Sequence, residues 1–216
     1  MARDKTPSQL KLPTRDRVLD AAERLLARGG AAFSMRELAE EAGVSFATPF
    51  NQFGSKAAIM LALSTRLIAS MQEQLARASL PDTALARVLQ AVDIAASVML
   101  AAPAVNRAVM AAIGAPSDEP SEVSSRSAAL WAEALADGEA LLPATRPLAV
   151  AVIPSQLAIA FRGVLSFWTA GEIPDRLLKK RARAAAATVL LGFVAREDRL
   201  RLISLLEDGS EAKDRA

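Results

Sequence analysis

The chain has 216 residues, of which 52% are hydrophobic and 4% aromatic, and its formal net charge is +2. It contains no cysteine, histidine or tyrosine, which excludes disulfides, thiolate and imidazole chemistry, and the usual zinc and haem ligands. Alanine recurs from one end to the other and strand-like alternation is nearly absent, so the composition favours close-packed helices. We therefore predict an all-α fold.

Three helices are predicted near the N-terminus. Apolar residues recur at helical spacing after Thr14, and Gly29 is placed to end this first helix. Ser34 and Glu37 have the spacing of a capping box, which opens a second helix. Ser45 is the expected N-cap of a third. The expected ranges are 14–29, 34–42 and 45–52.

The second and third helices form a predicted helix-turn-helix. Gly43 closes the second helix, and only Val44 separates it from Ser45, so the two helices meet at a tight turn. Such a pair lets one helix cross the DNA backbone while the other enters the major groove, which is ~12 Å wide. Residues 14–56 are therefore expected to form a DNA-binding head.

The turn and third helix carry a family resemblance. Residues 43–56 read Gly-Val-Ser-Phe-Ala-Thr-Pro-Phe-Asn-Gln-Phe-Gly-Ser-Lys. This resembles the TetR family of bacterial regulators, whose head typically ends in Gly-Val-Ser-x-Gly-Thr-Leu-Tyr-x-His-Phe-x-Ser-Lys. The resemblance covers residues 14–56. It implies a ligand-responsive transcriptional repressor that binds a palindromic operator as a homodimer and is released by a small effector.

Two kinds of DNA contact are expected from the head. Arg36 and Lys56 stand at helix starts, where free backbone N–H groups add attraction for phosphates. Phe46, Thr48 and Asn51 lie on the outward side of the third helix and are expected to read bases, with Phe46 against a thymine methyl. The full predicted set is Arg15, Arg36, Ser45, Phe46, Thr48, Phe50, Asn51, Gln52 and Lys56.

Four positions depart from the TetR pattern. Phe50 lacks the hydroxyl that the family's tyrosine offers to a phosphate, so that contact is lost or replaced. Gln52 can still donate a hydrogen bond where histidine does, and Ala47 is nearly as small as glycine. Pro49, as the fourth helical residue after Ser45, forfeits an early backbone hydrogen bond. A distorted third helix is therefore expected.

The basic N-terminal arm, residues 1–13, precedes the head. Residues 1–17 carry five basic and two acidic side chains, a net +3. Two interpretations stand for the arm: it lies against DNA phosphates, or it is a solvated tail.

Residues 57–207 are expected to form a helical body for ligand binding and dimerisation, followed by a tail over 208–216. Pro154 either kinks a helix or lets a new one begin at Ser155. Arg162 lies inside the most apolar stretch and costs roughly 2.5–3.5 kcal/mol in a bilayer, which argues against a membrane span. With no secretory signal recognised, a cytoplasmic protein is expected. Later helices are expected around 104–113, 126–141, 147–171, 175–195 and 198–207.

The TetR resemblance implies an effector pocket in the body. Its candidate lining is Met99, Met110, Ile113, Trp131 and Phe161, which suggests an apolar or aromatic effector. Methionines at such positions are more often core filler than ligand contacts.

The last two long helices are expected to supply a partner surface, because residues 156–168 and 184–194 offer small side chains beside large apolar ones. Paired across a two-fold axis, they form a four-helix bundle. An intramolecular core is the alternative for these residues. The predicted dimer residues are Leu157, Phe161, Leu165, Trp168, Val189 and Phe193.

Two other classes of protein are weighed against a repressor. Asp93, Glu133 and Glu139 offer carboxylates for acid/base work, but no spacing supports a catalytic site, and no glycine-rich phosphate loop or metal cluster is visible. We therefore expect no enzyme activity, cofactor or metal. The second rival is a helical DNA-binding or scaffold protein without an effector.

Overall fold

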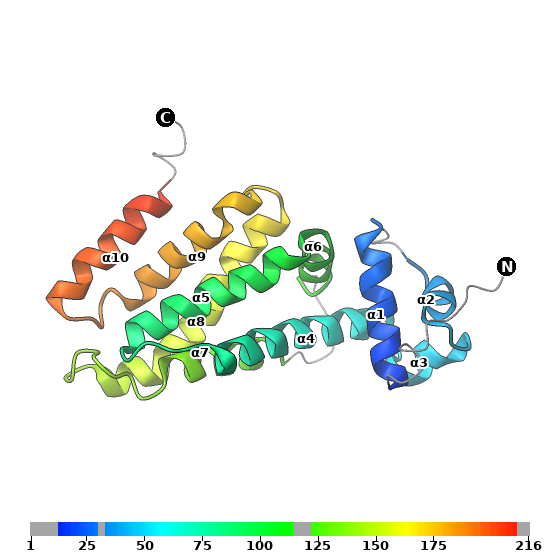
Figure 1. Ribbon diagram of the computed structural model, residues 1–216, viewed down its shortest axis with the longest axis horizontal. Helices are drawn as coiled ribbons and strands as arrows, with labels where there is room; N and C mark the ends of the chain where they lie inside the picture. The colour runs from blue at the N-terminus through cyan, green and yellow to red at the C-terminus, as the bar shows by residue number, and fades with distance from the viewer. Residues whose placement is uncertain (1–12, 30–32, 115–121, 211–216) are drawn as a thin grey trace. The chain divides into compact units, whose positions relative to one another are not determined.

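The computed structural model describes residues 13–29, 33–114 and 122–210 (Figure 1). Across these ranges the chain forms ten α-helices and no strand, which confirms the predicted all-α class. The basic arm, residues 1–12 of it, lies outside the described residues. The helices are α1 Thr14–Ala27, α2 Met35–Ala42, α3 Ala47–Phe53, α4 Lys56–Arg77, α5 Ala84–Ala101, α6 Pro103–Ala112, α7 Val123–Leu135, α8 Arg146–Thr169, α9 Asp175–Leu190 and α10 Arg196–Gly209.

The helices fall into two compact units, and the division lies within α4. The first unit contains the described part of the head together with residues 57–64 and 104–114. The second contains the described residues of 65–103 and 122–210.

Local capping defines the helices of the head. The Ser34 hydroxyl accepts a hydrogen bond from the Glu37 backbone N–H at 3.2 Å, and the Glu37 carboxylate accepts one from the Ser34 N–H at 2.7 Å. The predicted capping box is thus confirmed. Val18, Leu38 and Ile59 are completely buried, and α1 packs against α2.

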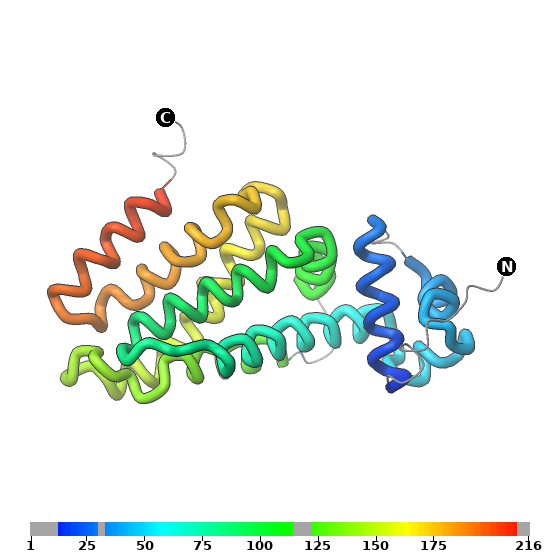
Figure 2. The backbone as a smooth tube through the Cα atoms, in the orientation of Figure 1, coloured from blue at the N-terminus to red at the C-terminus, as the bar shows by residue number. Residues whose placement is uncertain are grey.

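The second unit is built around α5, α8 and α9. Helix α5 packs against α7 and α9, α8 packs against the same two helices, and α10 packs on α9 (Figure 2). Trp131 and Trp168 are completely buried. Ala182, Ala186 and Ala187 form the buried side of α9, and their small side chains permit the close helix packing that the alanine content predicted.

Helix α8 runs without interruption through Pro154. The proline is buried, and the Ser155 hydroxyl donates a hydrogen bond to the Val152 carbonyl at 2.9 Å. No new helix begins at Ser155, so one of the two alternatives left by the sequence is removed.

Two helix ends near the C-terminus differ from expectation. Helix α9 ends at Leu190 instead of residue 195, because the next residues turn to meet the loop before α8: Leu142 donates its N–H to the Phe193 carbonyl at 2.9 Å, and Leu141 forms an isolated antiparallel bridge with Val194. Helix α10 extends to Gly209, two residues into the predicted tail.

Helices α5 and α8 are long and apolar enough, by length and composition, to cross a membrane. Most of the apolar window of α5 is buried, but only a third of that of α8. The apolar surface of α5 is therefore accounted for by the core, whereas α8 keeps an apolar face exposed.

Candidate nucleic-acid interface

The turn between α2 and α3 is held by backbone hydrogen bonds. Gly43 adopts the left-handed conformation, with φ 63° and ψ 41°. Its N–H donates to the Glu40 carbonyl at 3.1 Å, and the Val44 N–H donates to the Ala39 carbonyl at 3.0 Å. These two bonds define a Schellman motif, in which glycine is the residue that pays no steric penalty. The predicted role of Gly43 is confirmed.

Arg17 on α1 fastens this turn from outside. Its guanidinium donates two hydrogen bonds of 3.0 Å, one to the Ala42 carbonyl and one to the Gly43 carbonyl. These carbonyls receive no hydrogen bond from within α2, so the Arg17 guanidinium satisfies them. Its positive charge is also favourable there, because it lies at the negative end of the helix dipole. Sequence reasoning missed this contact, since no local spacing connects Arg17 with the turn.

Arg15 performs a similar task at the end of α3. It donates to the Gln52 carbonyl at 3.0 Å, and its guanidinium carbon lies 4.2 Å from the centre of the Phe53 ring. Arg15 was predicted to contact DNA. In the structure it holds the end of α3 in place. Because Arg15 is also exposed, its contact with DNA stays a prediction.

Glu41 ties α2 to α1 through two arginines. Its carboxylate accepts from Arg24 Nε at 2.8 Å and from Arg28 Nη1 at 2.9 Å. The hydrogen bond from Arg28 is the largest cause that lowers the pKa of Glu41 below its usual value, followed by that from Arg24 and opposed by burial. The ion pairs help to fix α2 against α1.

The expected distortion of α3 by Pro49 is wrong. The helix begins at Ala47, not Ser45, so Pro49 is its third residue. The first four N–H groups of a helix have no internal partner, and a proline there forfeits nothing. Its ring is buried. The expected N-cap Ser45 instead shares a 2.8 Å hydrogen bond with the Thr48 hydroxyl.

The outer face of α3 exposes uncharged side chains. Phe46 is 58% exposed and Phe50 is 42% exposed, and their rings pack edge to face with centres 5.5 Å apart. Asn51 and Gln52 are exposed on the same short helix, whereas Thr48 is half-buried. The structure therefore exposes four of the predicted contacts, three on α3 and one at its N-cap.

The two predicted phosphate contacts differ in availability. The Arg36 side chain is 80% exposed and has a long 3.9 Å pair with Glu40. Lys56 is half-buried: its ammonium donates to the Phe33 carbonyl at 2.9 Å and lies 4.2 Å from the centre of the Phe33 ring. Burial lowers the pKa of Lys56, opposed by Glu37. Arg36 is the more accessible cation.

The predicted effector-pocket residues are distributed over both units. Trp131 and Phe161 meet in the second unit, edge to face, with ring centres 5.3 Å apart. Met99 is buried in α5, while Met110 and Ile113 belong to the first unit. Around Trp131 and Phe161 the packing leaves no room for a water molecule. The Trp131 indole N–H is buried without a hydrogen-bond acceptor among the described residues.

The predicted dimer surface must be corrected. Leu157, Phe161, Leu165 and Trp168 lie on the inner side of α8 and are at most 7% exposed within the chain, so they belong to its own core. Val189 and Phe193 are half-buried. The apolar residues of α8 can be recognised in the sequence, but not the side of the helix that α7 and α9 cover. The large apolar side chains that α8 leaves exposed are Leu148, Val150, Ile159 and Phe167.

Comparison with known proteins identifies the helix-turn-helix. Residues 18–63 match the family described as bacterial regulatory proteins, tetR family. The head of the chain therefore carries the DNA-binding domain of the TetR family, whose members are transcription factors and not enzymes. No curated protein sequence matches the chain significantly.

Solved TetR structures share the fold at low sequence identity. A TetR transcriptional regulator from Rhodococcus sp. RHA1 has a TM-score of 0.64 and 19% identity, covering 82% of this chain and 96% of its own. TylP from Streptomyces fradiae has a TM-score of 0.57 and 18% identity, with 92% and 98% covered. CprB from S. coelicolor A3(2) has a TM-score of 0.51 and 20% identity, with 92% and 98% covered.

Proposed function

We propose that this protein is a cytoplasmic, ligand-responsive repressor of the TetR type. It binds a palindromic operator as a homodimer and leaves it when a small apolar or aromatic effector binds. The observation that carries the proposal is the exposed, uncharged surface of α3 and its N-cap residue, which includes Phe46, Phe50, Asn51 and Gln52.

The chemistry of this face suits base edges. Helix α3 contains no charged residue, so it is not built to bind phosphates. An asparagine can bond the two major-groove groups of adenine, and an exposed ring can contact the methyl group of thymine. We assign base recognition to Asn51 and Phe46, and phosphate contact foremost to Arg36, because the Lys56 ammonium is held at Phe33.

The homodimer is proposed to form through the outer side of α8. Leu148, Ile159 and Phe167 are 56%, 62% and 54% exposed. They are 11 and 8 residues apart, close to three and two helical turns, so they lie on one stripe. Burying such a stripe against a second copy removes apolar surface from water. Val189 and Phe193, half-buried beside the end of α9, remain candidates for the rim.

The effector site is proposed around Trp131 and Phe161. A buried N–H without an acceptor costs about 1–3 kcal/mol, and a ligand carrying an acceptor beside an apolar or aromatic group relieves that cost. Because the described packing has no room for a water there, the site must open to admit the effector. A ligand that prefers the opened form weakens operator binding by the same factor by which the operator weakens ligand binding.

The closed packing also favours a second candidate function. A TetR-type protein that binds DNA without an effector needs no cavity beside Trp131. Loss of operator affinity on addition of an aromatic compound separates the two candidates, since the second one predicts no response.

The DNA proposal is tested with a duplex selected by the protein from a random-sequence pool. We expect this duplex to bind at least ~10³-fold more tightly than a scrambled one, measured by fluorescence anisotropy. The double variant Phe46→Ala, Asn51→Ala should lose most of this preference. As matched control, Arg36→Gln should weaken both duplexes about equally and reduce the salt dependence.

Two results contradict the proposal. Selection that enriches no sequence shows that α3 does not read bases. An unchanged preference in the double variant shows that base recognition lies elsewhere. The dimer is tested separately by light scattering: Ile159→Glu should give a monomer at micromolar concentration, whereas Ile203→Glu on α10 should not.

A further inference from the structure

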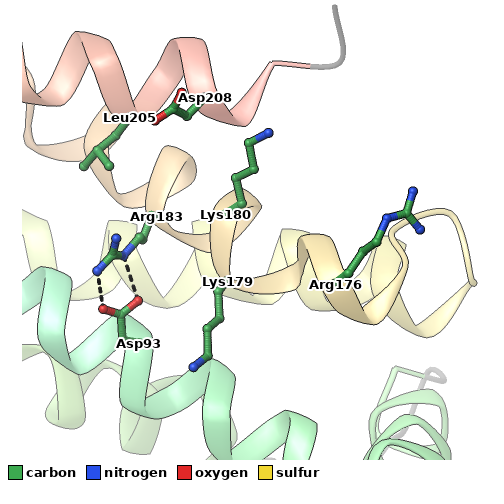
Figure 3. Close-up of a pocket in the computed structure, with 7 residues that line it drawn as sticks. All are labelled: Asp93, Arg176, Lys179, Lys180, Arg183, Leu205 and Asp208. Atoms are coloured by element: carbon green, nitrogen blue, oxygen red, sulfur yellow. Dashed lines mark hydrogen bonds and ion pairs between the residues drawn. The ribbon is translucent and has the colours of Figure 1, made fainter. Parts of the chain in front are cut away.

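A basic pocket in the second unit is separate from both sites above. It has a volume of about 430 Å³ and lies where α9 faces α5 and α10 (Figure 3). Its wall on α5 is Asp93, and its wall on α10 is Leu205 and Asp208. Helix α9 contributes four cations to it: Arg176, Lys179, Lys180 and Arg183.

The four cations share one face of α9. Counted from Arg176, the other three follow after three, four and seven residues, which places all four on one side of the helix. Like charges at this spacing destabilise a helix slightly, and Arg176 and Lys179 stand near its N-terminal end, where the helix dipole disfavours cations. Within α9 itself, these four positive charges are therefore unfavourable. A bound anion beside them removes the repulsion.

The pocket keeps an excess of positive charge after its internal ion pair is counted. Arg183 holds Asp93 with two hydrogen bonds, one of them from Nε to Oδ1 at 2.7 Å. This pair is neutral and joins α9 to α5 (Figure 3). The remaining charges in the lining are three cations and the Asp208 carboxylate, which gives a net charge of +2.

Two of these cations are available to a ligand. Arg176 and Lys179 are exposed, and neither side chain has a hydrogen bond or ion pair with another residue in the described parts of the chain. Binding an anion there breaks no existing contact. Leu205 and the lysine stems supply apolar surface for the carbon skeleton of an organic ligand.

We propose that this pocket binds a small organic dianion, a phosphate ester or a dicarboxylate, between α9 and α10. A guanidinium can hold a phosphate or carboxylate with two parallel hydrogen bonds, and ammonium groups add point charges. The volume is in the range of small-molecule sites, which span roughly 300–1,000 Å³. A ligand in contact with Arg176, Lys179 and α10 holds the two helices together.

Calorimetry on the full chain tests the proposal, with inorganic pyrophosphate and succinate as probes. We expect saturable binding of at least one probe at low salt, weakened by added salt. The double variant Arg176→Gln, Lys179→Gln should bind roughly tenfold or more weakly. The matched control Arg199→Gln, an exposed arginine of α10 outside the pocket, should bind like the unchanged protein. Tighter pyrophosphate binding indicates a phosphate ligand, and tighter succinate binding indicates a dicarboxylate.

Three outcomes overturn the proposal: no saturable binding of either probe, equal affinity in the double variant, or displacement of the probe by scrambled duplex DNA together with weaker DNA binding in the double variant. The last outcome assigns the pocket to the DNA backbone. Circular dichroism verifies that the variants are folded. The experiment involves no operator and no apolar effector, so its result is independent of the proposed repressor function.

Discussion

Arg17 in the head and Arg87 in the body make the same kind of contact. Each guanidinium donates hydrogen bonds to carbonyl oxygens at the C-terminal end of a neighbouring helix. Arg17 donates to two carbonyls at the end of α2, both at 3.0 Å. Arg87 donates to two at the end of α7, at 3.3 and 3.4 Å, and to the Asp82 carbonyl at 2.6 Å.

The segments that follow these contacts make the difference. After α2 the chain enters α3, whose Phe46 and Phe50 face solvent. The helix that Arg87 caps contains Trp131, which is completely buried. The same kind of hydrogen bond therefore precedes an exposed helix in the head and caps a helix of the buried core in the body. Variants in the two regions should separate DNA binding from stability.

The largest expected effect is that of Trp131→Ala. Removing a completely buried indole leaves a cavity and should lower the free energy of unfolding by about 3–5 kcal/mol, measured by urea denaturation. Trp131→Phe is the matched control, because it keeps an aromatic ring beside Phe161 and removes the unpaired N–H. It should cost less than about 1.5 kcal/mol. Equal losses in the two variants contradict this account of the core.

Arg17→Gln is expected to have the next largest effect. The loss of two hydrogen bonds to carbonyls at the turn should cost about 1–3 kcal/mol and weaken operator binding, because α3 is no longer fixed. Arg87→Gln should cost at least as much stability without changing the DNA affinity of the folded protein. Unaltered DNA affinity in a folded Arg17→Gln variant shows that the contact does not position α3.

A smaller, pH-dependent effect is expected from Glu41→Gln. Arg28 and Arg24 lower the pKa of Glu41 in the folded protein, so its stabilisation is fully present above the unfolded-state value of 4.5 and is lost as pH falls through the folded-state pKa. The variant should lose up to about 1 kcal/mol at neutral pH. The gap between the two proteins should narrow below pH 4.5, and a gap independent of pH argues against the ion pairs.

Phe46→Ala should change stability least. Its ring is mostly exposed, so the free energy of unfolding should stay within about 0.5 kcal/mol of that of the unchanged protein. A buried aromatic ring of the same size would cost far more to remove. Thermal denaturation should therefore show an unchanged melting temperature, whereas anisotropy should show weaker binding to the selected duplex. A large fall in stability indicates that the ring packs inside the head.

Short-range patterns carried most of the predictions that the structure confirms. The capping box of Ser34 and Glu37 and the left-handed Gly43 depend on residues next to one another in the sequence. Pro49 shows the limit of such reasoning: a shift of two residues in the start of α3 changes it from a disruptive position to a harmless one. In the structure the Ser45 hydroxyl shares a hydrogen bond with the hydroxyl of Thr48.

The sequence by itself determined the helical class, the helix-turn-helix and the family resemblance, because spacing, caps and composition act over a few residues. Only the tertiary structure decided that Leu157 and Trp168 face inward while Ile159 and Phe167 face outward. It also brought Arg17 to the turn and gathered charges from α5, α9 and α10 around one pocket. These contacts join residues distant in the sequence, and helix packing, which no local pattern encodes, sets which of them meet.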